Sequence, residues 1–202
     1  MKNNIILSDF TNFVGGWSLS PYSIYLSYKH STNNGIFNIL EFGSGDGTNK
    51  LVEYLIDKKI DFKYTSIEHD TDYAKTPNVD YIIYPLDYDY TPSDIEKIDL
   101  KLDRIFDLVI VDGPHGVGRA KWYSKFKDNI RKGTIVLIDD FHHYEEFEIE
   151  LNKVFEYETI NIFNIDRRFT NETVNDGLEL VDENSPYHSN KTHKIIKIIK
   201  NK

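Results

Sequence analysis

A glycine-rich turn between a strand-like run and a helix-like run constrains this chain more than any other feature. Residues 36–40 are apolar at four of five positions and lead to Glu41, where the sequence EFGSGDGT begins. Residues 49–58 then repeat apolar side chains at helical spacing. Glycines permit a tight turn, and the start of a helix offers free N–H groups to a ligand. The sequence therefore predicts a strand, a ligand-binding turn and a helix over residues 36–58.

The rest of the chain alternates between strand and helix patterns, which predicts a mostly parallel sheet with helices on both faces. Further strands are expected at residues 62–68, 81–84, 106–111, 134–138, 159–165 and 194–200. Helices are expected from Pro21 to about His30 and at residues 93–98, 120–130 and 144–155. We interpret residues 1–202 as one α/β domain, with a helical lead-in over 1–35 and a lid or loop excursion over 166–192.

Composition excludes several classes of protein. The chain contains no cysteine, so disulfide frameworks and thiolate sites are excluded. A formal net charge of −9 argues against binding to long nucleic acids, which need a basic surface. No segment has the roughly 20 apolar residues of a membrane span, and the start lacks a secretory leader. We expect a cytoplasmic protein without membrane contact, and the sequence leaves homodimerisation open.

The details of the turn favour a methionine-type cofactor. Its spacing is G-x-G-x-G rather than the G-x-G-x-x-G of dinucleotide-binding folds. Glu41 would repel a pyrophosphate but could accept a hydrogen bond from an ammonium group. Glu68, at the end of the second predicted strand, suits the two hydroxyls of a ribose. Asp87 follows the third strand, where it is either an adenine neighbour or an ordinary turn residue.

Four segments in this order, ILEFGSGDGT, YTSIEHD, FDLVIVDGPHG and GTIVLIDDFHHYEE, resemble class I S-adenosylmethionine-dependent methyltransferases over most of the chain. The resemblance implies a single Rossmann-like domain with a seven-stranded, mostly parallel sheet and an antiparallel last strand. It also implies S-adenosylmethionine as cofactor. The expected cofactor-binding residues are Glu41, Phe42, Gly43, Ser44, Gly45, Gly47, Glu68, His69, Asp87 and Asp112.

Three aspartates follow the fourth and fifth predicted strands. Asp112, Asp139 and Asp140 could converge, because the carboxyl ends of these strands open toward one crevice. Carboxylates without histidine or cysteine favour Mg²⁺, then Mn²⁺ or Ca²⁺. This pattern resembles the metal-dependent O-methyltransferases of the catechol and caffeoyl-CoA type. In the alternative, Asp112 orients the substrate and the other two aspartates cap the following loop.

The catalytic residues are expected to be His115 and Asp112. Histidine serves as a base near neutral pH, although the catechol enzymes carry a lysine three residues beyond their aspartate. His142 and His143 are rival bases. Arg119 either binds an acidic substrate group or belongs to a solvated helix face.

The expected function is metal-assisted O-methylation of a small hydroxylated acceptor, such as a sugar, a diol or a catechol. One alternative is an aminopropyltransferase on the same fold, which would use a decarboxylated cofactor. A second alternative is a methyltransferase-like protein that binds the cofactor without turnover. An NAD-dependent oxidoreductase is the least favoured alternative, because Glu41 at the turn would repel the pyrophosphate of NAD.

Overall fold

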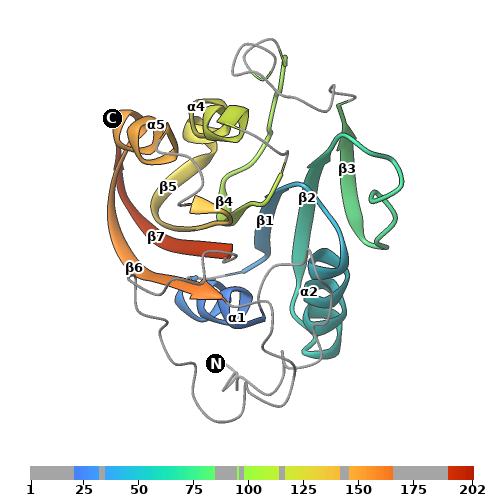
Figure 1. Ribbon diagram of the computed structural model, residues 1–202. Helices are drawn as coiled ribbons and strands as arrows, with labels where there is room; N and C mark the ends of the chain where they lie inside the picture. Colours follow the sequence, from blue (N-terminus) through green and yellow to red (C-terminus); the bar gives the residue numbers. More distant parts are fainter. Residues whose placement is uncertain are drawn as a thin grey trace.

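The computed structural model describes residues 21–31, 35–84, 95, 98–113, 117–141, 146–165 and 191–202. These residues form one seven-stranded sheet in the order β3-β2-β1-β4-β5-β7-β6 (Figure 1). The strands are β1 (Phe37–Phe42), β2 (Phe62–Glu68), β3 (Val79–Ile83), β4 (Phe106–Val111), β5 (Ile130–Ile138), β6 (Phe155–Ile165) and β7 (Lys191–Asn201). The helices are α1 (Pro21–His30), α2 (Asp46–Asp57), α4 (Trp122–Phe126) and α5 (Glu146–Val154), with the 3-10 helices η2 (Val117–Lys121) and η3 (Lys127–Asn129).

Strand direction follows the expected pattern. β1 pairs in parallel with β2 and β4, and the parallel pairing continues outward to β3 and β5. β7 is antiparallel to both of its neighbours, β5 and β6. The predicted mostly parallel sheet with an antiparallel last strand is confirmed.

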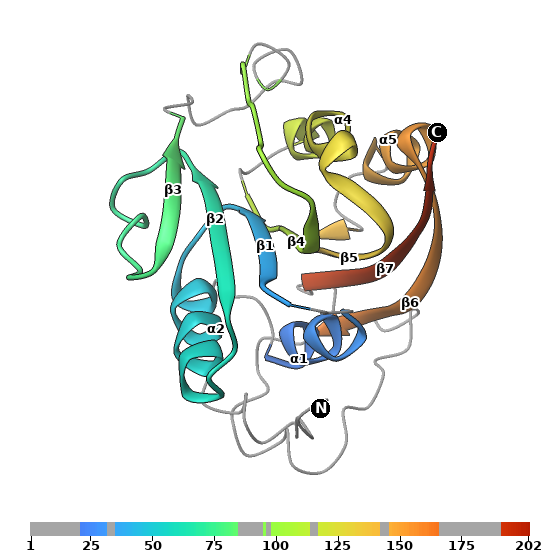
Figure 2. The same ribbon diagram turned by 180° about the vertical axis from the view of Figure 1, so that it is seen from behind.

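Helices cover both faces of the sheet. α1 and α2 lie on one side and α4 and α5 on the other, as the two opposite views show (Figures 1 and 2). Residues of β4 alternate between the two cores, with Leu108 and Ile110 packed on the α1–α2 side and Val109 and Val111 on the α4–α5 side. Successive strand residues point to opposite faces, so a central strand with apolar residues at every position fits a sheet covered on both sides.

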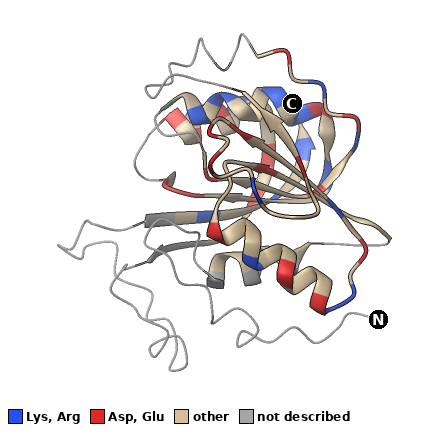
Figure 3. Cartoon of the chain, turned by 90° about the vertical axis from the view of Figure 1, so that its right-hand side faces the viewer, with Lys and Arg blue, Asp and Glu red and all other residues tan. Residues whose placement is uncertain are grey.

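The helix after the glycine-rich turn is amphipathic. Leu51 and Leu55 are fully buried against the sheet, whereas both acidic and basic residues lie along its outer side (Figure 3). The helix begins at Asp46, three residues earlier than the sequence pattern indicates. The reason is Thr48, whose hydroxyl accepts a hydrogen bond from the Gly45 N–H at 3.0 Å and so draws the turn into the helix start.

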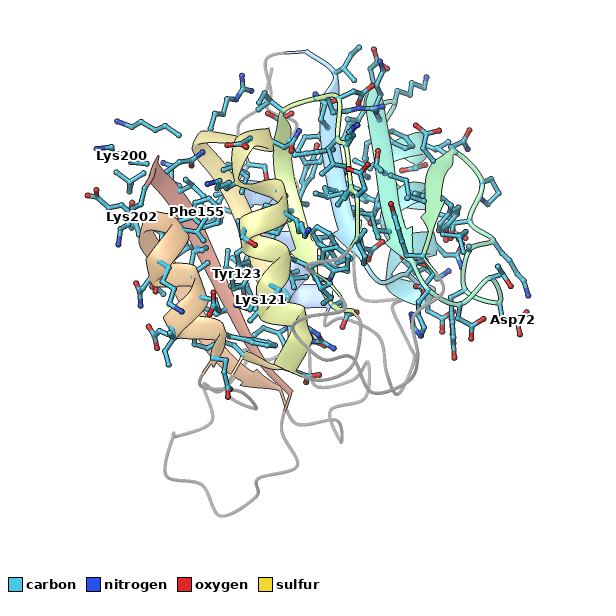
Figure 4. The ribbon with its side chains drawn as sticks, turned by 90° about the horizontal axis from the view of Figure 1, so that it is seen from above. Asp72, Lys121, Tyr123, Phe155, Lys200 and Lys202 are labelled. Carbon is cyan, nitrogen blue, oxygen red and sulfur yellow. The ribbon has the colours of Figure 1, made fainter. Side chains whose placement is uncertain are left out.

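One predicted helix is wrong in extent. Residues 120–130 were expected to form a continuous helix, but the chain forms η2, the short α4 and η3 before β5 begins at Ile130. Asn129 stops the helix, because its side-chain amide donates to the carbonyl oxygens of Leu102 and Arg104, both at 2.9 Å. The side chains of Tyr123, from α4, and Phe155, from β6, are buried where these helices meet the sheet (Figure 4).

The N-terminal and C-terminal predictions fall partly outside the described residues. The helix expected from Pro21 to His30 is present as α1. Residues 166–190 of the predicted lid lie outside the described residues. The last two residues of that range, 191 and 192, belong to β7, which begins at Lys191. Within the described part of the chain, no helix combines the length and apolar character needed to cross a bilayer.

Candidate functional site

The turns that follow β1, β4 and β5 lie side by side at the carboxyl edge of the sheet. Each turn begins with a backbone N–H that continues the strand ladder by one step. The Gly43 N–H donates to the carbonyl oxygen of Ile67 at 2.9 Å, and the Asp112 N–H donates to that of Phe42 at 2.9 Å. The Asp139 N–H donates to the carbonyl oxygen of Val111 at 3.0 Å. The predicted cofactor and acceptor segments therefore share one edge.

Two glycines let the β1 and β4 turns touch. A Cβ added to Gly113 would lie 2.8 Å from the Cα of Gly43, and a Cβ added to Gly43 would lie 3.0 Å from the Gly113 nitrogen. Gly43 also has φ +96°, in the left-handed region where other residues are strained. These glycines are required for backbone contact between the two turns.

Trp122 anchors the contact from the α4–α5 side. Its ring is buried and stacks on Phe42 with ring centres 4.4 Å apart. Its indole Nε1–H donates to the Gly113 carbonyl oxygen at 3.2 Å. Trp122 and Phe42 therefore belong to the core beneath the turns.

Glu41, the last but one residue of β1, is a buried acid held by two hydroxyl groups. The Thr48 hydroxyl donates to its Oε2 at 2.8 Å, and the Tyr64 hydroxyl donates to the same oxygen at 2.9 Å. Glu41 is 2% exposed. Among the described residues, the contacts of this carboxylate are hydroxyl groups rather than cations.

The electrostatics of Glu41 follow from this setting. Burial raises the pKa of Glu41 to about 8, and the neighbouring Glu68 adds a smaller upward push. The hydrogen bonds from Thr48 and Tyr64 act in the opposite direction on this pKa. A cationic ligand would favour the ionised carboxylate.

Glu68, the last residue of β2, ties the end of that strand to the glycine-rich turn. Its Oε1 accepts the N–H groups of His69 and Asp70 at 2.7 and 3.0 Å. Its Oε2 accepts the Ser44 hydroxyl at 3.1 Å. The His69 side chain is also close, with Nδ1 2.7 Å from Glu68 Oε1. The structure thus brings four predicted cofactor residues, Glu41, Ser44, Glu68 and His69, to the same end of the edge.

The glycine-rich turn presents open backbone at the start of α2. A Cβ added to Gly45 would meet no atom within 4 Å. The first N–H groups of a helix have no partners inside the helix, and they attract negative or polar ligand atoms. Gly45 therefore provides the open approach expected of a ligand-binding turn, whereas Gly47 is buried in the first turn of α2.

Asp139, directly after β5, is buried at the other end of the edge. Its Oδ1 lies 2.7 Å from Nε2 of His193, a residue of β7. The Nδ1 atom of the same imidazole contacts the hydroxyl of Ser23 on α1. All three side chains are buried, with Asp139 1% exposed. One imidazole thus joins α1, β5 and β7.

Asp140 continues this turn in an unusual backbone conformation. Its φ is +54°, in the left-handed region. Arg119 of η2 lies beside it, with Nη1 3.5 Å from Asp140 Oδ2 and donating to the Asp139 carbonyl oxygen at 3.3 Å. Arg119 is buried, so the alternative that placed it on a solvated helix face is wrong.

The predicted metal site does not fit these residues. Within the described part of the chain, no three His, Cys, Asp or Glu side chains gather closely enough to hold a metal ion. The proposed ligands Asp112, Asp139 and Asp140 thus do not form one ligand set. The physical reason is that Asp139 faces an imidazole and Asp140 faces a guanidinium, which compete with a cation for the carboxylate oxygens.

Several predicted residues lie outside the described residues. They are Asp87, His115, His142 and His143. The assignment of His115 as the base remains a prediction.

Sequence reasoning missed Thr48, Tyr64, Ser23 and His193 as partners of the predicted acids. Thr48 stands within the glycine-rich motif, three residues after Gly45, and that spacing is a usable signal for a helix cap. Tyr64 and His193 carry no such local signal, because strand register alone brings them to Glu41 and Asp139.

No protein-family model matches the chain, and no curated protein matches its sequence. Solved structures do match. The precorrin-6Y C5,15-methyltransferase of Geobacter metallireducens gives a TM-score of 0.53 at 9% identity, covering 95% of this chain and 96% of that chain. A protein of Thermoplasma acidophilum, provisionally assigned as a methyltransferase, gives a TM-score of 0.51 at 18% identity, covering 82% and 70%.

A third match is the N-methyltransferase NodS of Bradyrhizobium japonicum, solved in complex with S-adenosylhomocysteine. Its TM-score is 0.50 at 10% identity, covering 89% of this chain and 87% of that chain. At these identities the shared property is the fold. The chain therefore has the Rossmann-like fold of S-adenosylmethionine-dependent methyltransferases.

Proposed function

We propose that this chain is an S-adenosylmethionine-dependent methyltransferase that methylates an oxygen of a small hydroxylated molecule. The observation that carries the proposal is Glu41, a buried carboxylate at the end of β1 that is held by the hydroxyls of Thr48 and Tyr64. Hydroxyl donors orient the carboxyl group without supplying a positive charge, so a bound cation would stabilise its ionised form. An ammonium group, as in a methionine-type cofactor, supplies that cation, whereas a dinucleotide would bring a pyrophosphate.

The chain's own residues divide the binding task. Glu41 would hold the ammonium group, Glu68 the ribose hydroxyls, and the backbone around Gly45 the remainder of the cofactor. When bound, S-adenosylmethionine supplies an electrophilic methyl group. Asp112, at the end of β4, would orient the hydroxyl of the acceptor. His115 would accept the proton that this hydroxyl loses.

The choice of a small, hydroxylated acceptor rests on chemistry and charge. The carboxylate of Asp112 at the end of β4 suits a hydroxyl donor, and a formal net charge of −9 disfavours a phosphate-rich polymer. Because the aspartates after β5 do not fit a metal site, no step of the proposed reaction passes through a metal ion.

Isothermal titration calorimetry with S-adenosylhomocysteine tests the cofactor assignment. The wild-type chain should bind this ligand and should not bind NAD. Glu41→Gln and Glu68→Gln should each weaken binding about tenfold or more, since each loses a charge-assisted hydrogen bond. Glu53→Gln, on the exposed side of α2, is the matched control and should bind like the wild type.

The same titration separates the alternatives. Tighter binding of decarboxylated S-adenosylmethionine would favour an aminopropyltransferase. Binding without methyl transfer to any hydroxylated acceptor would favour a protein that holds the cofactor without turnover. Failure to bind S-adenosylhomocysteine at all would overturn the proposal.

A further inference from the structure

The acid turn after β5 is held by side chains from two other elements, β7 and η2. His193 of β7 contacts Asp139, and Arg119 of η2 contacts both Asp140 and the Asp139 carbonyl oxygen. Lys194, the residue after His193, places its Nζ 4.2 Å from the ring centre of Phe141. Neighbouring residues of a strand point to opposite faces, so His193 and Lys194 contact the turn from opposite sides of the sheet.

We propose that His193 is a positioning residue that fixes the turn after β5 without a metal ion, and that fixes α1 over the same edge through Ser23. The inference rests on the proposed function only in treating this turn as the acceptor side of the site. It adds a residue and an arrangement that the methyl-transfer chemistry alone does not specify.

The charge arrangement supports a metal-free turn. A divalent ion would need several carboxylate oxygens at about 2.0–2.6 Å. Asp139 Oδ1 already lies 2.7 Å from the imidazole Nε2, so a cation at this oxygen would have to displace the imidazole. The guanidinium of Arg119 is permanently charged and lies 3.5 Å from Asp140 Oδ2, so it would repel a second cation there.

The backbone supports a positioning role. Asp140 has φ +54°, a conformation that costs free energy in a residue with a side chain and persists only when its surroundings fix it. Arg119 fixes the turn from the α4–α5 side, and His193 fixes it from the α1 side. A turn held in this way keeps one geometry before any acceptor arrives.

The chemistry of the imidazole suggests a precise replacement. A neutral imidazole has one donor and one acceptor nitrogen. In the tautomer that carries the proton on Nε2, Nδ1 accepts the Ser23 hydroxyl and Nε2 faces Asp139. A glutamine side chain also offers one N–H group and one oxygen, so His193→Gln can restore both contacts, whereas His193→Leu removes both.

Hydrogen exchange of the free protein tests the positioning role. In His193→Leu, the amides of residues 139–141 and of α1 should exchange about tenfold faster, as expected for the loss of the buried Ser23 hydrogen bond and the buried contact with Asp139. His193→Gln should return the rates to near wild type. Ser23→Ala, a milder change, should speed exchange in α1 alone. Unchanged exchange in both His193→Leu and Ser23→Ala would overturn the proposal.

Two further measurements address the metal and the proton. Electron paramagnetic resonance of Mn²⁺ should show no bound ion with the wild-type chain at millimolar Mn²⁺. Binding of one Mn²⁺ that is lost in Asp139→Asn would overturn the proposal. Nitrogen-15 spectra of His193 should show the proton on Nε2, and a proton on Nδ1 alone would contradict the arrangement.

Cofactor binding separates this inference from the proposed function. S-adenosylhomocysteine affinity should be the same in wild type, His193→Gln and Ser23→Ala, because these residues lie away from Glu41 and Glu68. Loss of all S-adenosylhomocysteine binding would remove the proposed function, while the exchange and Mn²⁺ results would still decide the role of His193.

Discussion

The two ends of the sheet's carboxyl edge hold buried acids in different ways. At the proposed cofactor end, formed by β1, β2 and the start of α2, Glu41 accepts hydrogen bonds from the neutral hydroxyls of Thr48 and Tyr64. At the proposed acceptor end, formed by the turns after β4 and β5 and the start of β7, Asp139 faces the imidazole of His193 at 2.7 Å. Both acids are almost fully buried.

This contrast indicates what each end can still bind. Burial raises the pKa of a carboxyl group that is held by neutral donors, and a cationic ligand would stabilise its ionised form. A buried carboxylate beside a basic side chain already has a partner. Removing the carboxylate leaves that basic side chain buried without it. The cofactor end is therefore suited to a cationic ligand, and the acceptor end is suited to fixed geometry.

The largest expected effect is at the acceptor end. Asp139→Ala should lower the free energy of unfolding by about 3 kcal/mol, because it leaves the imidazole of His193 buried without its partner. Urea denaturation followed by circular dichroism measures this. Glu41→Gln is the counterpart at the cofactor end, and it should change stability far less. Equal losses in the two variants would break the comparison.

The junction between the two ends should be nearly as sensitive. Gly113→Ala should cost about 2 kcal/mol, since its Cβ would lie 2.8 Å from the Gly43 Cα and backbone must shift. Gly45→Ala is the matched control, because its Cβ would meet nothing within 4 Å. The midpoint temperature of thermal unfolding should fall only in Gly113→Ala. The affinity for S-adenosylhomocysteine should fall in Gly45→Ala.

The pH dependence of stability sharpens the comparison at the cofactor end. Burial raises the pKa of Glu41 from its ordinary value of 4.5 to about 8 in the folded chain. The folded state therefore binds this proton more tightly, and the stability that it contributes is complete below pH 4.5 and is lost as the pH rises toward 8.

Between pH 6 and pH 8, the wild type should lose about 2 kcal/mol more stability than Glu41→Gln, in which this titration is absent. Urea denaturation at both pH values measures the difference. Parallel stability curves for the two proteins would show that the folded state does not retain the proton of Glu41.

The smallest expected effect comes from Tyr64. Tyr64→Phe removes one hydroxyl donor to Glu41 and should cost about 1 kcal/mol. The loss of that donor should also move the pKa of Glu41 further upward, so the decline of stability with pH should shift to higher pH. Identical pH profiles in Tyr64→Phe and wild type would mean that Thr48 alone holds the carboxylate.

Much of the fold was predictable because its signals are local. The apolar run at residues 106–111 predicts a buried strand and the glycine-rich sequence from Glu41 predicts a turn, so the positions of strands and turns along the chain follow from short segments. The exception, residues 120–130, had helical spacing, and the side chain of Asn129 ended the helix by bonding to a distant loop.

The sequence by itself determined which acids stand at the carboxyl edge, since each follows a recognisable strand: Glu41, Glu68, Asp112, Asp139 and Asp140. Only the tertiary structure decided what holds them. Ser23 and His193 are 170 residues apart in the chain, and they meet at Asp139 because α1 packs on the sheet beside β5 and β7. Partners across a sheet depend on strand register and helix packing, neither of which is encoded in any short stretch of residues.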